Sequence, residues 1–245
     1  VSESHACLNC GVALSFQQAH CPSCGQSSAI RRITLGDIGG DFARAIFDVD
    51  RSVVALFKAL SVRPGVVADD YARGARRRYF SPFAFLLTVV GVTSLAIAMS
   101  GFQFVTSDNA ANGVVLFAQT HPNVLLLAQV PILAAIARLL FWAGGRHFAE
   151  YLVLAAYTIA MRAAFLTVVA LPVWYVVRDE PAAGPPLVAA YWLVWFAYFA
   201  FAAMQFHPAS GAWRRARHWC GGFLVAAVTQ YISVIGINRL ANLFG

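Results

Sequence analysis

Five long apolar stretches constrain the fold of this chain more than any other feature. Each is about 20 residues long, which is the length that an α-helix needs to cross the hydrocarbon core of a bilayer. With 60% hydrophobic and 12% charged residues, the 245-residue chain is too apolar for a soluble domain of this size. The third stretch is long enough to tilt, or to bend at Pro172. The predicted spans are approximately 82–101, 123–143, 148–177, 187–206 and 219–241. The sequence therefore predicts an all-α polytopic membrane protein whose transmembrane domain covers residues 81–245.

Four cysteines near the N-terminus form a second strong pattern. Cys7 and Cys10 belong to one CxxCG knuckle, and Cys21 and Cys24 belong to another. Two such pairs provide four thiolates for a tetrahedral metal, which predicts a structural zinc ribbon over residues 1–29. The alternative is a pair of disulfides, as in a secreted domain, but the repeated CxxC spacing and the absence of a signal peptide before the first knuckle disfavour it. A closed cage leaves no coordination position for a substrate, so we expect the zinc to serve folding or docking.

The sequence predicts a basic segment of amphipathic helices over residues 30–80. Thr34 and Asp37 resemble a capping box that opens a first helix, and the apolar segment after it is too short to span a bilayer. A third helix could begin at Pro64 and end at Gly74. These helices are predicted to lie at the membrane interface or to pack under the membrane domain. A small soluble bundle that completes the ribbon domain is the alternative.

The arginines predict the orientation of the spans. The formal net charge is +7, and Lys58 is the only lysine. With five spans, the arginines before the first span, Arg146, and the group Arg214, Arg215 and Arg217 all fall on one side. The positive-inside rule then places the N-terminus in the cytoplasm and the C-terminus outside. A reducing cytoplasm also keeps thiols available for a metal, so the two arguments agree.

The basic run before the first span is the predicted site for anionic lipid headgroups. Guanidinium groups there could grip lipid phosphates, and flanking tyrosine rings could sit at the interface. The alternative is an ordinary topology anchor without specific lipid contacts. Because the charge lies beside apolar spans, membrane lipids are favoured over nucleic acid as the partner. The predicted headgroup site consists of Arg73, Arg76, Arg77, Arg78, Tyr71 and Tyr79.

Polar residues within the spans form a second group of candidates. Arg162 falls near the middle of the third span, where an isolated charge costs at least ~2.5 kcal/mol. Counting residues from the cytoplasmic edge brings Gln129 and Gln230 to nearly the same depth. A structural polar network and an anion site both remain open for this layer. Arg138 and Glu150 lie at similar depth near the cytoplasmic edge, so they form an ion pair or Arg138 extends to the headgroups.

The N-terminal third of the chain carries a recognisable set of motifs. Arg63-Pro64-Gly65 precedes a pattern that falls on Tyr71, Gly74, Arg76, Arg78, Tyr79 and Pro82. With the two knuckles, these residues resemble a bacterial family of zinc-ribbon integral membrane proteins of unknown function. The resemblance covers about the first 85 residues, and Ala75 stands where that family usually has lysine. It implies a fold and a zinc site but no activity.

The sequence contains no GxSxG, Walker-type or HExxH motif. We therefore expect a non-enzymatic accessory, assembly or scaffold subunit whose cytoplasmic zinc ribbon docks or stabilises a protein partner in a membrane complex. The alternative is a lipid or small-anion transporter that uses the polar layer around Arg162. A membrane enzyme that acts on lipids is disfavoured, because Glu150 is the single acidic group that the membrane domain offers on the cytoplasmic side.

Overall fold

The computed structural model describes residues 5–15, 18–28, 52–102, 121–180, 182, 184–207 and 211–244. The N-terminal body is a small ribbon in which β1 (His5–Ala6) pairs antiparallel with β2 (Ala13–Leu14). A single bridge joins His20 to Ser27. The helix that the capping box predicts from Thr34 lies outside the described residues.

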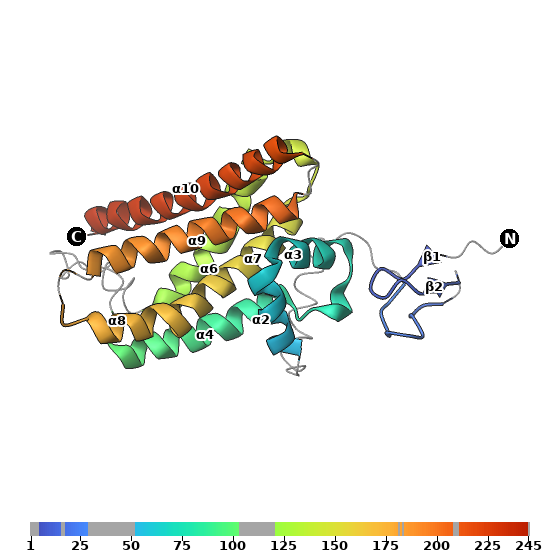
Figure 1. Ribbon diagram of the computed structural model, residues 1–245, viewed down its shortest axis with the longest axis horizontal. Coiled ribbons are helices and arrows are strands. Elements are labelled where there is room, and N and C mark those ends of the chain that lie inside the picture. Colours follow the sequence, from blue (N-terminus) through green and yellow to red (C-terminus); the bar gives the residue numbers. More distant parts are fainter. Residues whose placement is uncertain are drawn as a thin grey trace.

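Among the described residues, five helical segments are long and apolar enough to cross a membrane, which confirms the predicted all-α polytopic fold. They lie side by side in a bundle, with the ribbon beyond one end (Figure 1). We call this end of the bundle the ribbon-side end. The third segment is continuous over 30 residues and contains a π-helical turn, η3, directly before Pro172. Proline has no N–H and crowds the preceding turn, which explains why the helix widens there. The segments are α4 (Pro82–Ser100), α6 (Pro122–Leu140), α7 (Phe148–Phe165) continued by η3 (Leu166–Ala170) and α8 (Leu171–Val177), α9 (Gly184–Phe206) and α10 (Ala212–Phe244).

Helix α7 forms the centre of the bundle. The most apolar part of the α7 segment is 72% buried, against 22–33% for the other four spans. It packs against α4, α6, α9 and the short helix α3 (Pro64–Arg73). Many of its buried side chains are small, including Ala155, Ala156, Ala160 and Ala163. Small residues let helix backbones approach closely, which is the main source of packing energy inside a bilayer.

Short helices close the ribbon-side end of the bundle. Helix α3 (Pro64–Arg73) follows α2 (Ser52–Val62) and begins and ends where the sequence predicts, because Pro64 starts it and Gly74 ends it with φ of 116°. Its buried face contacts α7 and α9. Of the arrangements left open by the sequence, α3 therefore packs under the membrane bundle. The 3-10 turns η1 (Arg76–Arg78) and η2 (Trp142–Gly144) lie at the same end.

Gly65 allows α3 to cross α9 at very short distance. A β-carbon at this position would overlap the backbone carbonyl oxygen of Ala202, and the Gly65 N–H donates a hydrogen bond of 3.1 Å to Oε1 of Gln205. The glycine of the Arg-Pro-Gly motif is thus required by a helix crossing.

The last span starts earlier than predicted. The sequence places its start near residue 219 and leaves Arg214, Arg215 and Arg217 in a loop, whereas α10 begins at Ala212 and includes all three. Gly211, with φ of 97°, lies directly before the helix, and alanine and arginine are strong helix formers. At about 1.5 Å per residue, the 33-residue helix is roughly 50 Å long, longer than the ~30 Å apolar core. Hydropathy therefore marked the apolar part of this helix and not its first turns.

Replacing Gly65 with alanine tests the α3–α9 crossing. We expect Gly65→Ala to destabilise the protein by about 1–3 kcal/mol, because the added methyl group forces two backbones apart. Thermal unfolding of the detergent-purified protein measures the effect. Gly91→Ala is the matched control, since a β-carbon there meets nothing within 4 Å. Equal melting temperatures for the two variants would contradict the role of Gly65.

Candidate metal centre and buried polar sites

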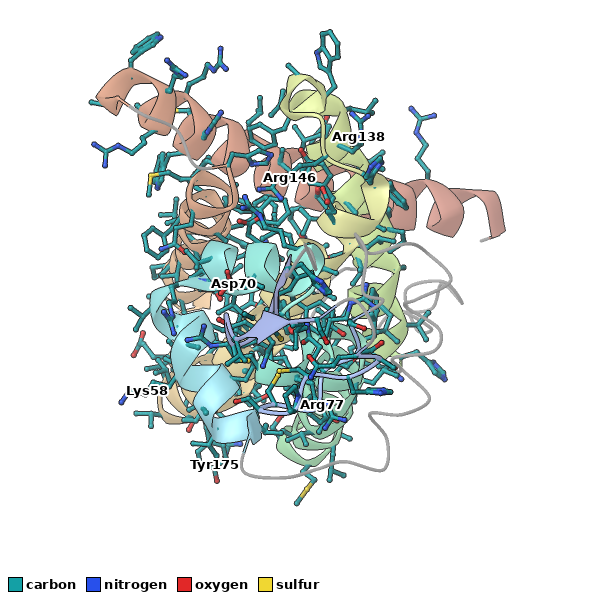
Figure 2. All side chains as sticks on the ribbon, turned by 90° about the vertical axis from the view of Figure 1, so that its right-hand side faces the viewer. Lys58, Asp70, Arg77, Arg138, Arg146 and Tyr175 are labelled. Atoms are coloured by element: carbon teal, nitrogen blue, oxygen red, sulfur yellow. The ribbon has the colours of Figure 1, made fainter. Side chains whose placement is uncertain are left out.

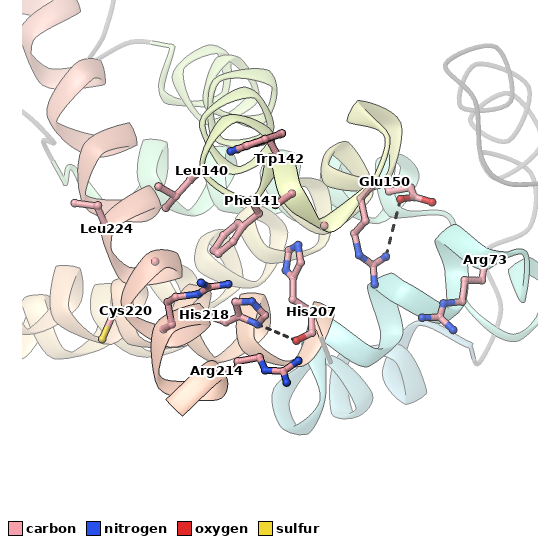
Figure 3. A pocket seen from close by; sticks show the side chains of 15 residues that line it. Arg73, Leu140, Phe141, Trp142, Glu150, His207, Arg214, His218, Cys220 and Leu224 are labelled. Atoms are coloured by element: carbon pink, nitrogen blue, oxygen red, sulfur yellow. Dashed lines mark hydrogen bonds and ion pairs between the residues drawn. The ribbon is translucent and has the colours of Figure 1, made fainter. Parts of the chain in front are cut away.

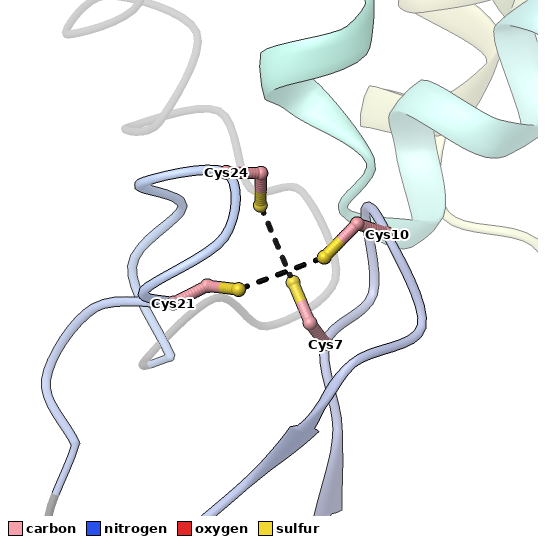
Figure 4. Close-up of side chains that lie close together, drawn as sticks. All are labelled: Cys7, Cys10, Cys21 and Cys24. Carbon is pink, nitrogen blue, oxygen red and sulfur yellow. Dashed lines mark hydrogen bonds between the residues drawn. The ribbon is translucent and has the colours of Figure 1, made fainter.

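The two knuckles bring the four predicted cysteine ligands together (Figure 4). The Sγ atoms of Cys7 and Cys24 lie 3.7 Å apart, those of Cys10 and Cys21 lie 3.6 Å apart, and all four fall within 4.8 Å of one another. A tetrahedral zinc with Zn–S bonds of about 2.3 Å requires sulfur separations of about 3.8 Å. A disulfide would require about 2.05 Å. The cage geometry therefore fits a four-thiolate metal site.

Each knuckle is shaped by the glycine that follows it. Gly11 and Gly25 have φ of 76° and 69°, and their N–H groups donate to the carbonyl oxygens of Cys7 and Cys21 at 2.9 and 2.8 Å. These turns hold both cysteines of each pair on the same side of the backbone. With all four sulfurs directed inward, a bound metal would have no open position for a substrate.

The ribbon contacts the helical bundle through the second knuckle. Gln26 is buried, and its Oε1 accepts a hydrogen bond of 3.4 Å from the backbone N–H of Arg77. Gly25 faces the guanidinium group of the same arginine. One member of the basic run therefore serves the junction between the ribbon and η1.

The structure does not gather the predicted headgroup residues into one surface. Tyr71 is buried edge-to-face against Tyr157, with ring centroids 6.0 Å apart. Tyr79 is also buried, and its hydroxyl donates to Oδ2 of Asp70 at 2.8 Å. The expectation that both rings lie among lipid headgroups is corrected, because packing of α3 under the bundle encloses them. They act as contacts within the ribbon-side end.

The four arginines of the run also diverge. Arg73 forms an ion pair with Asp69 at 2.9 Å, and Arg78 lies 5.6 Å from the centre of the Tyr79 ring. Arg77 is exposed beside the ribbon, and Arg76 is half-buried. Lipid binding by this run stays a prediction, and a single binding surface built from all four side chains is not what the structure contains.

Arg162 has its partners within the protein. The side chain is only 5% exposed, its Nη1 donates to Oε1 of Gln129 at 2.5 Å, and its Nε donates to the hydroxyl of Tyr191 at 3.1 Å. The rings of Trp192 and Trp195 lie 4.5 and 5.3 Å from its Cζ atom. Cation–π contacts of this kind stabilise a desolvated guanidinium. The arrangement supports a structural polar network.

Two outcomes at this layer differ from the sequence analysis. Gln129 is a partner, as predicted, but Gln230 is half-buried on α10 with no hydrogen-bond partner for its Oε1 among the described residues. The aromatic partners on α9 were missed. Depth counting would have found them, because Trp192 and Arg162 each lie 14 residues from the ribbon-side limits of their spans, Phe206 and Phe148. A comparison of depth that is limited to polar side chains leaves these aromatic residues out.

Glu150, in the first turn of α7, has an unexpected ion partner. Glu150 is buried, accepts a hydrogen bond of 3.1 Å from the His147 N–H, and lies 4.0 Å from Arg146. Arg146 also pairs with Asp69 of α3 at 2.8 Å. The ion pair between Arg138 and Glu150 stays a prediction. The sequence does not indicate the pairing of Asp69 with Arg146, because the two residues are far apart in the chain.

Part of this chain is similar to a protein family of unknown function. A family model described as "Protein of unknown function (DUF3667)" matches residues 53–93, which cover most of α2, then α3, η1 and the first part of α4. No curated protein and no solved structure matches the chain. Over those residues the chain is similar to a family whose function is unknown, and the four-cysteine group near its N-terminus could hold a metal ion.

Metal analysis tests the cysteine cage. We expect the purified protein to carry about one zinc ion per chain, and Cys7→Ser to carry almost none, because three thiolates no longer complete the tetrahedron. Mass spectrometry of the metal content makes the measurement. Cys220→Ser is the matched control, since this fifth cysteine lies on α10, outside the cage. Equal zinc content in all three proteins would refute the assignment.

Replacement of Arg162 separates structural from ligand-binding roles. Arg162→Leu leaves Gln129 and Tyr191 without their donor, so we expect a loss of about 1–3 kcal/mol in stability. The double variant Arg162→Leu/Gln129→Leu should recover part of this loss, because it also removes the buried Gln129 amide that would otherwise lack a donor. Thermal unfolding measures the stability of the single and the double variant. Arg178→Leu, at the exposed end of the bundle opposite the ribbon, is the control. An unchanged melting temperature for Arg162→Leu would contradict the structural role.

Proposed function

We propose that this protein is a multi-pass protein of the bacterial inner membrane that presents a cytoplasmic zinc ribbon as a docking module. Its partner would be another protein of a membrane complex, and the role would be accessory and non-catalytic. The observation that carries the proposal is the closed four-cysteine cage on a body outside the helical bundle. A metal with four protein ligands stabilises a fold and leaves the domain surface available for contacts.

The distribution of arginines supports the proposed orientation. Arg77 lies in η1, Arg138 in the last turn of α6 and Arg146 just before α7, all at the ribbon-side end; Figure 2 labels them in a view from that end. The arginines of the first turns of α10 belong to the same end, and Arg178 follows α8 at the opposite end. Because cytoplasmic loops are enriched in arginine, this asymmetry favours a cytoplasmic ribbon.

The ribbon surface supports the proposed docking role. The ribbon is too small to build a large apolar core, and its buried cluster consists of Cys7, Leu14 and Cys21, with Cys24 packed against it. Leu8, between the two cysteines of the first knuckle, is 56% exposed, and Val12 is exposed just after that knuckle. These side chains offer a partner an apolar contact held in place by the metal.

Transport through the layer around Arg162 is the weaker proposal. A transport site needs a charge that is free to receive its substrate. Gln129 and Tyr191 already accept hydrogen bonds from the Arg162 guanidinium, and Trp192 and Trp195 cover it. The contacts of this arginine therefore favour bundle assembly over substrate binding.

Site-specific photocrosslinking in cells tests the docking role. With a benzophenone side chain in place of Leu8, we expect one discrete adduct with a cytoplasmic or membrane protein. The adduct should vanish when Cys21→Ser breaks the cage, because the contact surface then loses its shape. A benzophenone in place of Asp179, which is exposed at the opposite end, is the matched control. An adduct that survives Cys21→Ser, or no discrete adduct from Leu8, would refute docking. An adduct with a periplasmic protein would refute the orientation.

A further inference from the structure

A large basic pocket opens at the ribbon-side end of the bundle (Figure 3). It has a volume of about 960 Å³ and lies between η2, the start of α7 and the first turns of α10. Its polar lining includes four arginines and two histidines. These are Arg73, Arg146, Arg214, Arg217, His207 and His218.

Positive charge dominates this pocket. Glu150 is the carboxylate in its lining, and nearby Asp69 pairs with both Arg73 and Arg146. Four guanidinium groups against these two carboxylates leave a net charge of +2. Arg214 and Arg217 are exposed on neighbouring turns of α10, and neither has an ion pair with a carboxylate among the described residues. Because residues three apart share a helix face, both charges can act on one ligand.

The pocket wall behind these arginines is fixed in place. Arg146 bonds to the carbonyl oxygen of Phe206 at 2.5 Å and lies 3.9 Å from the centre of the Phe206 ring. His207 lies between the Tyr151 hydroxyl, 2.9 Å from its Nε2, and the Ala203 carbonyl oxygen, 3.2 Å from its Nδ1. Burial lowers the pKa of His207 to about 4, so this ring is neutral near pH 7. It serves as part of the wall.

His218 is the histidine that remains available. Its Nδ1 lies 3.0 Å from the His207 carbonyl oxygen, which fixes the ring and makes Nδ1 the donor. Its Nε2 has no hydrogen-bond partner among the described residues. The pocket therefore offers an imidazole nitrogen beside the two arginines of α10.

One side of the pocket is apolar. Leu140, Trp142 and Leu224 line it, and each has a well-exposed side chain, with Trp142 71% exposed. Leu140 ends α6, and Leu224 lies on α10 within its predicted membrane part. Cations and an exposed apolar rim thus meet in one cavity. A soluble anion would contact the cations alone, whereas an anionic amphiphile would contact both the cations and the apolar rim.

We propose that this pocket binds a phosphate group, and that its source is the headgroup of an anionic phospholipid. Arg214 and Arg217 contact the phosphate oxygens, for which the planar guanidinium is well suited. The acyl chains follow Leu140 and Leu224. The site differs from the basic run before the first span, sharing only Arg73, and it does not depend on the docking role of the ribbon.

Lipid binding to the full-length purified protein tests the site. The probes are dioleoyl phosphatidylglycerol and dioleoyl phosphatidylcholine in detergent, with retention measured by native mass spectrometry. We expect preference for phosphatidylglycerol and a loss of about tenfold or more in its affinity for Arg214→Gln/Arg217→Gln. The matched control is Arg215→Gln/Arg178→Gln, which removes the same charge outside the pocket and should retain binding. Equal loss in both double variants, or equal binding of the two lipids, would overturn the site.

A second comparison distinguishes the two sources of phosphate. Glycerol 3-phosphate and inorganic phosphate carry the charge without acyl chains, so we expect both to compete poorly with phosphatidylglycerol. Leu224→Gln on the apolar rim should weaken lipid retention and leave the binding of soluble phosphate unchanged. Competition by glycerol 3-phosphate at the affinity of the lipid would overturn the lipid assignment. Thermal unfolding of each variant confirms that a lost signal does not come from a lost fold.

Discussion

The burial of α7 is the constraint on which the rest of the structure depends. Lipid tails are as apolar as leucine, so helices in a bilayer associate through close packing and polar contacts and not through the hydrophobic effect. The alanines of α7 permit close packing, and its polar groups provide the polar contacts. Arg162 binds Gln129 of α6 and Tyr191 of α9, and Thr93 of α4 donates to the carbonyl oxygen of Ala163 at 3.1 Å. Three neighbouring helices are thus held at nearly one level of the central helix.

The ribbon-side end depends on α3 in the same way. This helix crosses α9 through Gly65, carries Asp69 to Arg146, and places Tyr71 on Tyr157. The hydroxyl of Tyr157 in turn donates to the Phe80 carbonyl oxygen at 2.7 Å, which anchors the start of the first span. The segment that matches the uncharacterised family, residues 53–93, therefore forms the base that carries both proposed binding features. The ribbon contacts one part of this base, and Arg73 of α3 reaches the basic pocket.

The divergence of the basic run has a local physical reason. Residues 76–78 form a 3-10 turn, in which successive side chains point about 120° apart. Arg77 consequently lies beside the ribbon, while Arg78 stacks on Tyr79. Arginines that are neighbours in the sequence therefore do not form one surface. The basic pocket, in contrast, combines charges from α3, the turn before α7 and the arginine group of α10, so their meeting in one cavity does not follow from the sequence.

Features that depend on local length and spacing follow directly from the sequence. Apolar length predicts the spans, the CxxCG spacing predicts the cage, and Pro64 and Gly74 mark the ends of α3, because each depends on residues that are close in the chain. Only the tertiary structure decided which side chains meet. The aromatic enclosure of Arg162 and the pairing of Asp69 with Arg146 depend on how each helix is rotated about its axis. That rotation is set by packing among all the helices together, so hydropathy and spacing could not reveal it.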